Sequence, residues 1–222
     1  MPPKSYTSKL LHPHVGAIIG GNLLAFYFFA AKGLPFFMML FSFWVDSIFI
    51  VFFEMLEMVF AKKGFKSIVQ KIYKIITYGI IKLFVLGFYA IFLFAFIGFM
   101  MVPKDQSKYI FEAISFTNEW LNINLMIFLC MHVLYFFFGY LLPQKYLQRD
   151  ISLVSALFDV RTIILHIVMV AGFFLYQFIL DKSNSQTYAN LGITALFMFL
   201  KTSVDLIRLN LHNTENETPV FI

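Results

Sequence analysis

Long apolar runs occupy most of this chain and limit what it can fold into. Its 222 residues are 60% hydrophobic and 13% charged, and 31 of them are Phe. A soluble domain has roughly 45–50% apolar and about 25% charged residues. A soluble fold built from this composition would lack the polar side chains needed to cover its surface. The composition therefore predicts an integral membrane protein.

Six runs approach the length of about 20 mostly apolar residues that a helix needs to cross a bilayer. They cover residues 15–31, 35–60, 72–102, 123–142, 162–180 and 188–209. The expected fold class is therefore all-α: one integral membrane bundle of six transmembrane helices, with residues 1–222 forming a single domain. A mixed-polarity segment at 110–121 suggests an interfacial helix before the fourth run.

Two short features refine this expectation. Lys32-Gly33-Leu34-Pro35 predicts a tight turn between the first and second runs. Gly16 and Gly20, four residues apart in the first run, predict a close approach of another helix. A lone cysteine, Cys130, excludes an internal disulfide and a cysteine-based zinc cluster.

The distribution of Lys and Arg between the runs predicts the orientation, because cytoplasmic loops are enriched in both. One side would hold Lys4, Lys9, Lys62, Lys63, Lys66, Lys71, Lys74, Lys145, Arg149, Arg161 and Arg208. The opposite side would hold Lys32, Lys104, Lys108 and Lys182. Both termini are therefore expected in the cytoplasm. The protein is expected to be a multi-pass protein of the inner cell membrane.

This orientation assigns three segments to the cytoplasmic side. Residues 1–14 would be the cytoplasmic N-terminus, 61–74 a basic cytoplasmic loop, and 213–222 a loose C-terminal tail. The lysines at 62–74 would lie near anionic lipid headgroups. Because the basic residues separate apolar runs, the net charge of +5 does not indicate a nucleic-acid partner. The expected partners are the bilayer and either a second copy of the chain or another membrane protein.

Ionisable side chains inside the apolar runs point to an internal polar site. Each costs at least about 2.5–3.5 kcal/mol in hydrocarbon, so such residues usually face a partner or a wet cavity. The acids are Asp46, Glu54, Glu57 and Asp205, and the bases are Lys82, Arg161, Lys201 and Arg208. Matched numbers are typical of a mutually compensated network, because an unpaired buried charge costs several kcal/mol.

Helical spacing suggests how these side chains gather. At about 100° per residue, Asp46 and Glu57 are nearly eclipsed and Glu54 lies within about 80° of both, which predicts one acidic face. Lys201 and Asp205 are four residues apart, and His212 continues their stripe. The expected partners of Glu54, Glu57 and Asp205 are Arg161 and Lys201. The candidate cluster comprises Asp46, Glu54, Glu57, His132, Arg161, His166, Lys201, Asp205 and His212.

Two histidines inside apolar runs leave the chemistry of this cluster open. Asp46 is the expected partner of His132, while Asp205 or Glu54 is the expected partner of His166. If they converge, His132, His166, Asp46 and Asp205 could ligate a divalent metal such as zinc, iron or manganese. The same groups could instead relay protons or hold a coupled ion. A third alternative is a structural network that fixes the helix register and binds nothing.

At these residues the chain resembles a family of uncharacterised prokaryotic polytopic membrane proteins, known as a domain of unknown function. The similar segments are Phe43-Trp44-Val45-Asp46, His132 with Phe136, Asp159-Val160-Arg161 before Leu165-His166, and Leu200-Lys201-Thr202-Ser203-Val204-Asp205 with His212 and Glu215. The resemblance spans most of residues 36–217. Where the family often carries a His-Tyr-Gly stretch in the third run, this chain has Phe88-Tyr89-Ala90 and Gly98-Phe99. That difference argues against a histidine-rich metal site.

The sequence supports a membrane protein of unknown activity, with an acid, base and histidine cluster in its cytoplasmic half that binds an ion or small ligand. One alternative is a membrane-embedded, metal-dependent enzyme. Another is a structural or accessory subunit of a membrane complex.

Overall fold

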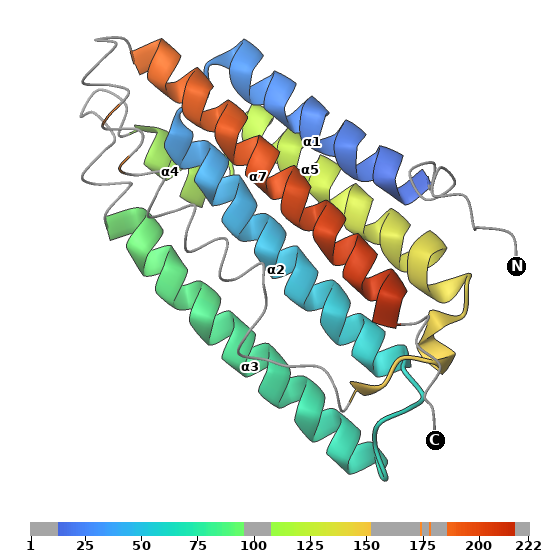
Figure 1. Cartoon of the computed structure of the whole chain (residues 1–222). Helices are drawn as coiled ribbons and strands as arrows, with labels where there is room; N and C mark the ends of the chain where they lie inside the picture. Colours follow the sequence, from blue (N-terminus) through green and yellow to red (C-terminus); the bar gives the residue numbers. More distant parts are fainter. Residues whose placement is uncertain (1–12, 96–107, 152–173, 175–177, 179–185, 216–222) are drawn as a thin grey trace, which may run out of the picture.

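The computed structural model, shown in Figure 1, describes residues 13–95, 108–151, 174, 178 and 186–215. Within these residues every extended regular element is a helix, and one isolated β-bridge joins Lys63 to Asp150. The helices are α1 (Pro13–Lys32), α2 (Phe36–Phe60), α3 (Ile68–Phe92), α4 (Lys108–Ile114), α5 (Glu119–Leu134), a π-helix (Tyr135–Leu141), a short 3₁₀ helix (Lys145–Leu147) and α7 (Gln186–Glu215).

The expected all-α class holds for these residues, and four of the six expected runs coincide with α1, α2, α5 with its π-helix, and α7. The third run coincides with α3 in part. The fifth, at 162–180, lies outside the described residues except for Phe174 and Phe178, which are helical.

Helix α2 occupies the centre of the bundle. It packs against α3 on one side and against α5 and α7 on the other, and α1 covers α5 and α7 (Figure 1). Sixteen of its residues are buried, among them Asp46 and Glu57. Its side chains therefore meet protein on most sides, and polar residues on α2 can be satisfied by neighbouring helices.

The chain direction of each helix places several segments at one end of the bundle. Helix α2 ends and α3 begins there, joined by residues 61–67, and α1 begins and α7 ends at the same end (Figure 1). We call it the basic end, because Lys62, Lys63 and Lys66 are exposed there. Helices α2 and α5 both run towards the basic end.

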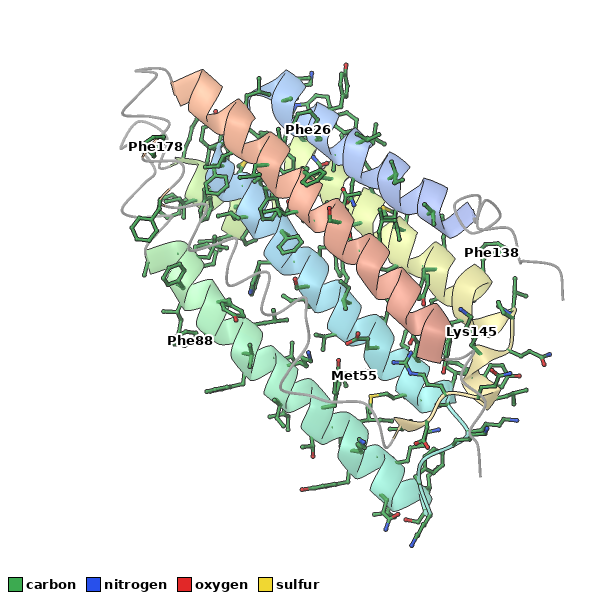
Figure 2. The ribbon with its side chains drawn as sticks, viewed as in Figure 1. Phe26, Met55, Phe88, Phe138, Lys145 and Phe178 are labelled. Atoms are coloured by element: carbon green, nitrogen blue, oxygen red, sulfur yellow. The ribbon has the colours of Figure 1, made fainter. Side chains whose placement is uncertain are left out.

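Three described helical stretches are long and apolar enough to cross a membrane: Phe36–Phe60, Ile68–Ala95 and Lys108–Leu141. Two shorter apolar helices are Ile18–Lys32 and Leu191–Ser203. Large apolar side chains also project outwards, for example Phe88 on α3 and Phe138 in the π-helix (Figure 2). Such an apolar exterior suits lipid rather than water.

The turn between α1 and α2 is the one that the sequence predicts. Gly33 has a φ of 59°, a left-handed conformation in which a Cβ would be strained. Its N–H donates to Ala30 O at 3.4 Å, and the Leu34 N–H donates to Phe29 O at 3.2 Å. These two bonds form a Schellman motif that satisfies the last carbonyls of α1. Pro35 is then the N-cap residue of α2, which starts at Phe36.

A second turn shortens the helix expected at 110–121. Helix α4 ends at Ile114, and Phe116 has a φ of 54°. Asn118 caps α5, because its side chain accepts a hydrogen bond from the Leu121 N–H at 3.0 Å. The polar residues of this segment therefore form a turn and a cap between two helices.

Helix α3 begins at Ile68, four residues before the expected start at 72, so the second half of the expected loop 61–74 is helical. The Ser67 side chain caps this helix by accepting from the Gln70 N–H at 3.3 Å. Lys71 reaches back across the turn, and its Nζ donates to Val59 O at 2.5 Å and Ala61 O at 2.8 Å. Lys71 thus satisfies carbonyls at the end of α2.

The outer boundaries of the bundle also differ from expectation. Helix α1 starts at Pro13, inside the expected N-terminal segment 1–14, since proline is well tolerated in a first helical turn. Helix α7 continues to Glu215, so residues 213–215 of the expected loose tail are helical. Residues 216–222 lie outside the described part.

Helix α1 approaches its neighbour closely at Gly21, one residue after the Gly16–Gly20 pair that the sequence predicts. A Cβ built at Gly16 or Gly20 would meet nothing within 4 Å. A Cβ at Gly21 would lie 2.0 Å from the sulfur of Met131 on α5. The rotation of α1 about its axis therefore turns Gly21, and not the Gly16–Gly20 pair, towards its neighbour.

Candidate functional site

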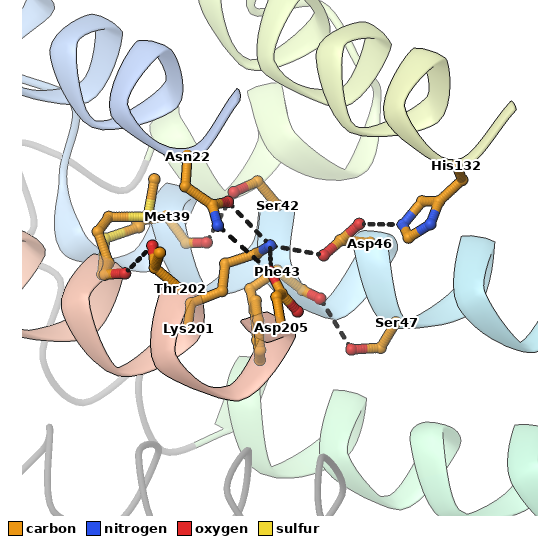
Figure 3. Close-up of polar contacts among 11 residues, drawn as sticks. Asn22, Met39, Ser42, Phe43, Asp46, Ser47, His132, Lys201, Thr202 and Asp205 are labelled. Atoms are coloured by element: carbon orange, nitrogen blue, oxygen red, sulfur yellow. Dashed lines mark hydrogen bonds and ion pairs between the residues drawn. The ribbon is translucent and has the colours of Figure 1, made fainter. Parts of the chain in front are cut away.

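Asp46 lies at the centre of the described polar contacts. It is 1% exposed, near the middle of α2, and its two oxygens contact different helices. The Nε2 atom of His132 on α5 is 2.7 Å from Oδ1, and the Nζ atom of Lys201 on α7 is 3.3 Å from Oδ2 (Figure 3). The His132–Asp46 contact is the one that the sequence predicts.

Lys201 joins Asp46 to a second carboxylate. Its Nζ donates to Asp205 Oδ2 at 2.7 Å, an i,i+4 pair within α7 as expected from the spacing. The same Nζ donates to Asn22 Oδ1 at 3.0 Å, and Asn22 Nδ2 donates to Asp205 Oδ2 at 3.3 Å. We call Asn22, Asp46, His132, Lys201 and Asp205 the central cluster; it draws on α1, α2, α5 and α7.

Asn22 is the member that the sequence reasoning missed. It is 2% exposed and lies in the apolar, glycine-rich first run. A search for charged and histidine side chains passes over it because an amide carries no charge. The one sequence feature that could identify Asn22 is its polar side chain within an apolar run, since a buried amide needs hydrogen-bond partners.

The surroundings of the central cluster are aromatic. The Lys201 Nζ lies 4.8 Å from the centre of the Phe128 ring and 5.7 Å from that of Phe43. Both ring faces attract the ammonium group. Ser42 and Ser47 donate to carbonyls of their own helix, Met39 O at 2.8 Å and Phe43 O at 3.0 Å. Both serine hydroxyls therefore bond to the backbone of α2.

The net charge of the central cluster depends on whether His132 is neutral or protonated. Asp46 and Asp205 contribute two negative charges and Lys201 one positive charge, so the sum is −1 with a neutral His132 and 0 with a protonated one. A net charge is costly away from water. A proton on His132 therefore offsets the negative sum of these described side chains.

Glu57 belongs to a separate pair nearer the basic end. Its Oε2 accepts from the Arg149 guanidinium, and its backbone carbonyl accepts from the Tyr140 hydroxyl at 2.7 Å. The expected partners were Arg161, which lies outside the described residues, and Lys201, which contacts Asp46 and Asp205. Arg149 was assigned to a loop, but that loop folds back beside the end of α2, where Ile151 N–H donates to Lys63 O at 3.3 Å.

Glu54 faces a third direction, so the three carboxylates of α2 do not form one acidic cluster. Its Oε2 accepts from the Tyr78 hydroxyl on α3. Lys82, 4% exposed, lies on the same side of α3, with its Nζ 5.8 Å from the Tyr78 ring centre. The 80° between Glu54 and Asp46 is enough to separate them, because α2 has α3 on one side and α5 on the other.

The described residues contain no group of three or more His, Cys, Asp or Glu side chains arranged to hold a metal ion. In the central cluster the Lys201 ammonium already lies between Asp46 and Asp205. A divalent cation in that place would meet a positive charge, so these residues do not fit a metal. His166, the other proposed metal ligand, lies outside the described residues, as does Arg161. His212 lies in α7, but its side chain is not described.

Residues 5–219 match the model of a family of unknown function, DUF6498. The chain belongs to this family. The matched region contains every residue of the central cluster and of the Glu57–Arg149 pair. No curated protein and no solved structure matches the chain. Membership of DUF6498 thus agrees with the expected resemblance to an uncharacterised family and assigns no activity.

Proposed function

We propose that this protein is an integral membrane protein whose central cluster binds an exchangeable ion, and that the ion is a proton held by the His132–Asp46 pair. The observation that carries the proposal is the set of contacts in which Lys201 bridges two carboxylates and His132 bonds to one of them. One added proton balances the charge of this set.

The accessibility of the members indicates where the proton would bind. The side chains of Asp46 and Lys201 are 2% and 4% exposed, whereas that of His132 is 20% exposed. Histidine is also the side chain that ordinarily changes charge near neutral pH. Among the described residues, Asp46 of α2 contacts His132, and Lys201 and Asp205 of α7 with the neutral Asn22 of α1 lie one or two contacts further on.

The membrane setting is part of this proposal. We propose six spans with both termini in the cytoplasm and the protein in the inner membrane of its cell. Support comes from the chain directions, because α1 begins and α7 ends at the basic end (Figure 1). The exposed Lys62, Lys63 and Lys66 at that end would contact anionic headgroups, while Lys71 is used to cap α2.

Hydrogen–deuterium exchange at the imidazole C2 position, followed by mass spectrometry across pH in detergent, tests the proposal. The exchange rate of His132 is expected to follow a sigmoid with pH, because the proposal has this ring take up and release a proton. Asp46→Asn removes the negative charge beside the ring, so the protonated ring loses its contact with a carboxylate and the sigmoid is expected at lower pH than in the unaltered protein. Glu54→Gln removes a carboxylate from the same helix that faces Tyr78, and should leave the midpoint in place.

Two results would overturn the proposal. A His132 exchange rate without a pH-dependent transition would mean that the cluster is a structural network that fixes the four helices. Stoichiometric metal in the purified protein, lost in His132→Gln, would instead favour the metal-dependent enzyme.

A further inference from the structure

Two charged pairs lie along one seam, which has α2 on one side and α5 with the segment that follows it on the other. Asp46 bonds to His132, and eleven residues later on α2 Glu57 pairs with Arg149 at the basic end. Asp46, Phe53 and Glu57 follow at i, i+7 and i+11, so they share one face of α2. Phe53 therefore lies between the two pairs.

Aromatic rings fill the space between these pairs. The Phe53 ring centre is 5.8 Å from that of His132 and 5.8 Å from that of Phe136. Phe136 in turn lies 5.9 Å from Tyr140. Phe53, Phe136 and Tyr140 are 8%, 5% and 0% exposed and form a small buried cluster of their own. We call these three rings the aromatic seal.

The π-helix keeps the seal in line with the histidine. Its wider turn is visible in the Leu142 N–H, which donates to Phe137 O five residues earlier at 2.9 Å. Residues four apart in an α-helix drift by about 40° around the axis. A wider turn rotates less per residue, which holds Phe136 and Tyr140 towards α2. The Tyr140 hydroxyl then bonds to Glu57 O and ties the seal to the outer pair.

We propose that the aromatic seal is the gate between the central cluster and the aqueous phase at the basic end. In the proposed membrane setting the exposed part of the His132 side chain meets lipid, so water and protons reach the ring from the basic end when Phe53 and Phe136 move apart. The Glu57–Arg149 pair closes the outer mouth of the seam. This inference rests on the proposed function, because it gives the side from which the exchanging proton arrives. An apolar seal suits this role, since it excludes water while the rings are packed.

The same C2 exchange experiment separates access from charge state. Its midpoint reports proton binding at His132, and its plateau rate reports how readily solvent reaches the ring. Phe53→Ala is expected to raise the plateau rate by about tenfold or more, because it removes the ring that covers the imidazole. Phe136→Leu keeps an apolar side chain but opens the second layer, so a smaller increase is expected from a variant that disturbs folding less.

Phe84→Ala is the matched control, because Phe84 on α3 is 77% exposed and remote from the seam. Its plateau rate should equal that of the unaltered protein. If Phe53→Ala and Phe136→Leu both leave the rate unchanged, solvent reaches His132 by another route and the gate is wrong. An equal increase in Phe84→Ala would mean general loosening of the bundle, which also contradicts it. If the His132 rate showed no sigmoid with pH, but the rates of the three variants still differed as expected, the proposed function would be wrong and the gate would stand.

Discussion

Lys201 is the residue on which the central cluster depends, because its ammonium lies between the buried Asp46 and the partly buried Asp205. Its ammonium contacts Asn22, Asp46 and Asp205 together, so each neighbour is satisfied through it. Removing one partner of a buried ion pair is more costly than replacing the whole pair, since it leaves a charge without compensation. The stability of the bundle is therefore expected to be sensitive to this single side chain.

Lys201→Met keeps most of the side-chain length and removes the charge. It is expected to lower the free energy of unfolding by about 3–5 kcal/mol, because Asp46 and Asp205 lose their cation. Unfolding in mixed micelles would measure the change, with Lys66→Met at the exposed basic end as the control. Adding Asp205→Asn should restore part of the loss, and a double variant no more stable than Lys201→Met would contradict the pairing.

At the scale of helices, α1 is held against the bundle by a close contact as well as by the Asn22 hydrogen bonds. Gly21 and Asn22 are adjacent, so the rotation of α1 that turns one towards α5 also brings the other to Lys201 on α7. The two contacts therefore reinforce the same orientation of the helix. A larger side chain at Gly21 should disturb both.

Gly21→Leu is expected to destabilise the protein by about 1–3 kcal/mol, the usual cost of overpacking. Alanine could be accommodated by a shift of the flexible Met131 side chain, whereas leucine is too large. Gly20→Leu is the matched control: its Cβ meets open space, and replacing glycine in a helix gains up to about 1 kcal/mol. Thermal unfolding in detergent measures the melting temperatures of Gly21→Leu and Gly20→Leu. Equal melting temperatures would show that α1 does not pack as described.

The whole molecule has two chemically distinct ends. The 61–67 turn, the start of α1 and the end of α7 share the basic end, whereas the turn between α4 and α5 lies at the other end, where Phe116 is 5.8 Å from Phe41 near the start of α2. The proposed orientation puts the basic end in the cytoplasm. The aromatic gate would then open to the cytoplasm as well.

Cysteine labelling tests this orientation in a Cys130→Ser background. In intact cells, a membrane-impermeant maleimide is expected to label Thr117→Cys and to leave Ser67→Cys unlabelled until the membrane is opened. Both positions are exposed, so protein burial does not decide the result. The reverse pattern would invert the topology and place the gate on the outer face.

The sequence by itself determined helices α1, α2, α5 and α7 to within a few residues, the turn at Gly33 and the pair formed by Lys201 and Asp205. Each depends on residues close in the chain, where backbone geometry fixes the spacing: a glycine for a left-handed turn, or two side chains one helical turn apart. The sequence could also predict the His132–Asp46 contact, because few polar groups lie at that depth in two neighbouring helices.

Only the tertiary structure decided which neighbour each remaining polar residue meets. Glu54 turns to Tyr78, Glu57 to Arg149, and Asn22 to Lys201, because these contacts depend on how each helix is rotated and which helix lies beside it. That rotation is set by the packing of all the helices at once, and no local pattern contains it. The π-helix also depends on packing rather than on a local pattern. Its shift in register places Phe136 and Tyr140 against α2, and contact with α2 stabilises it.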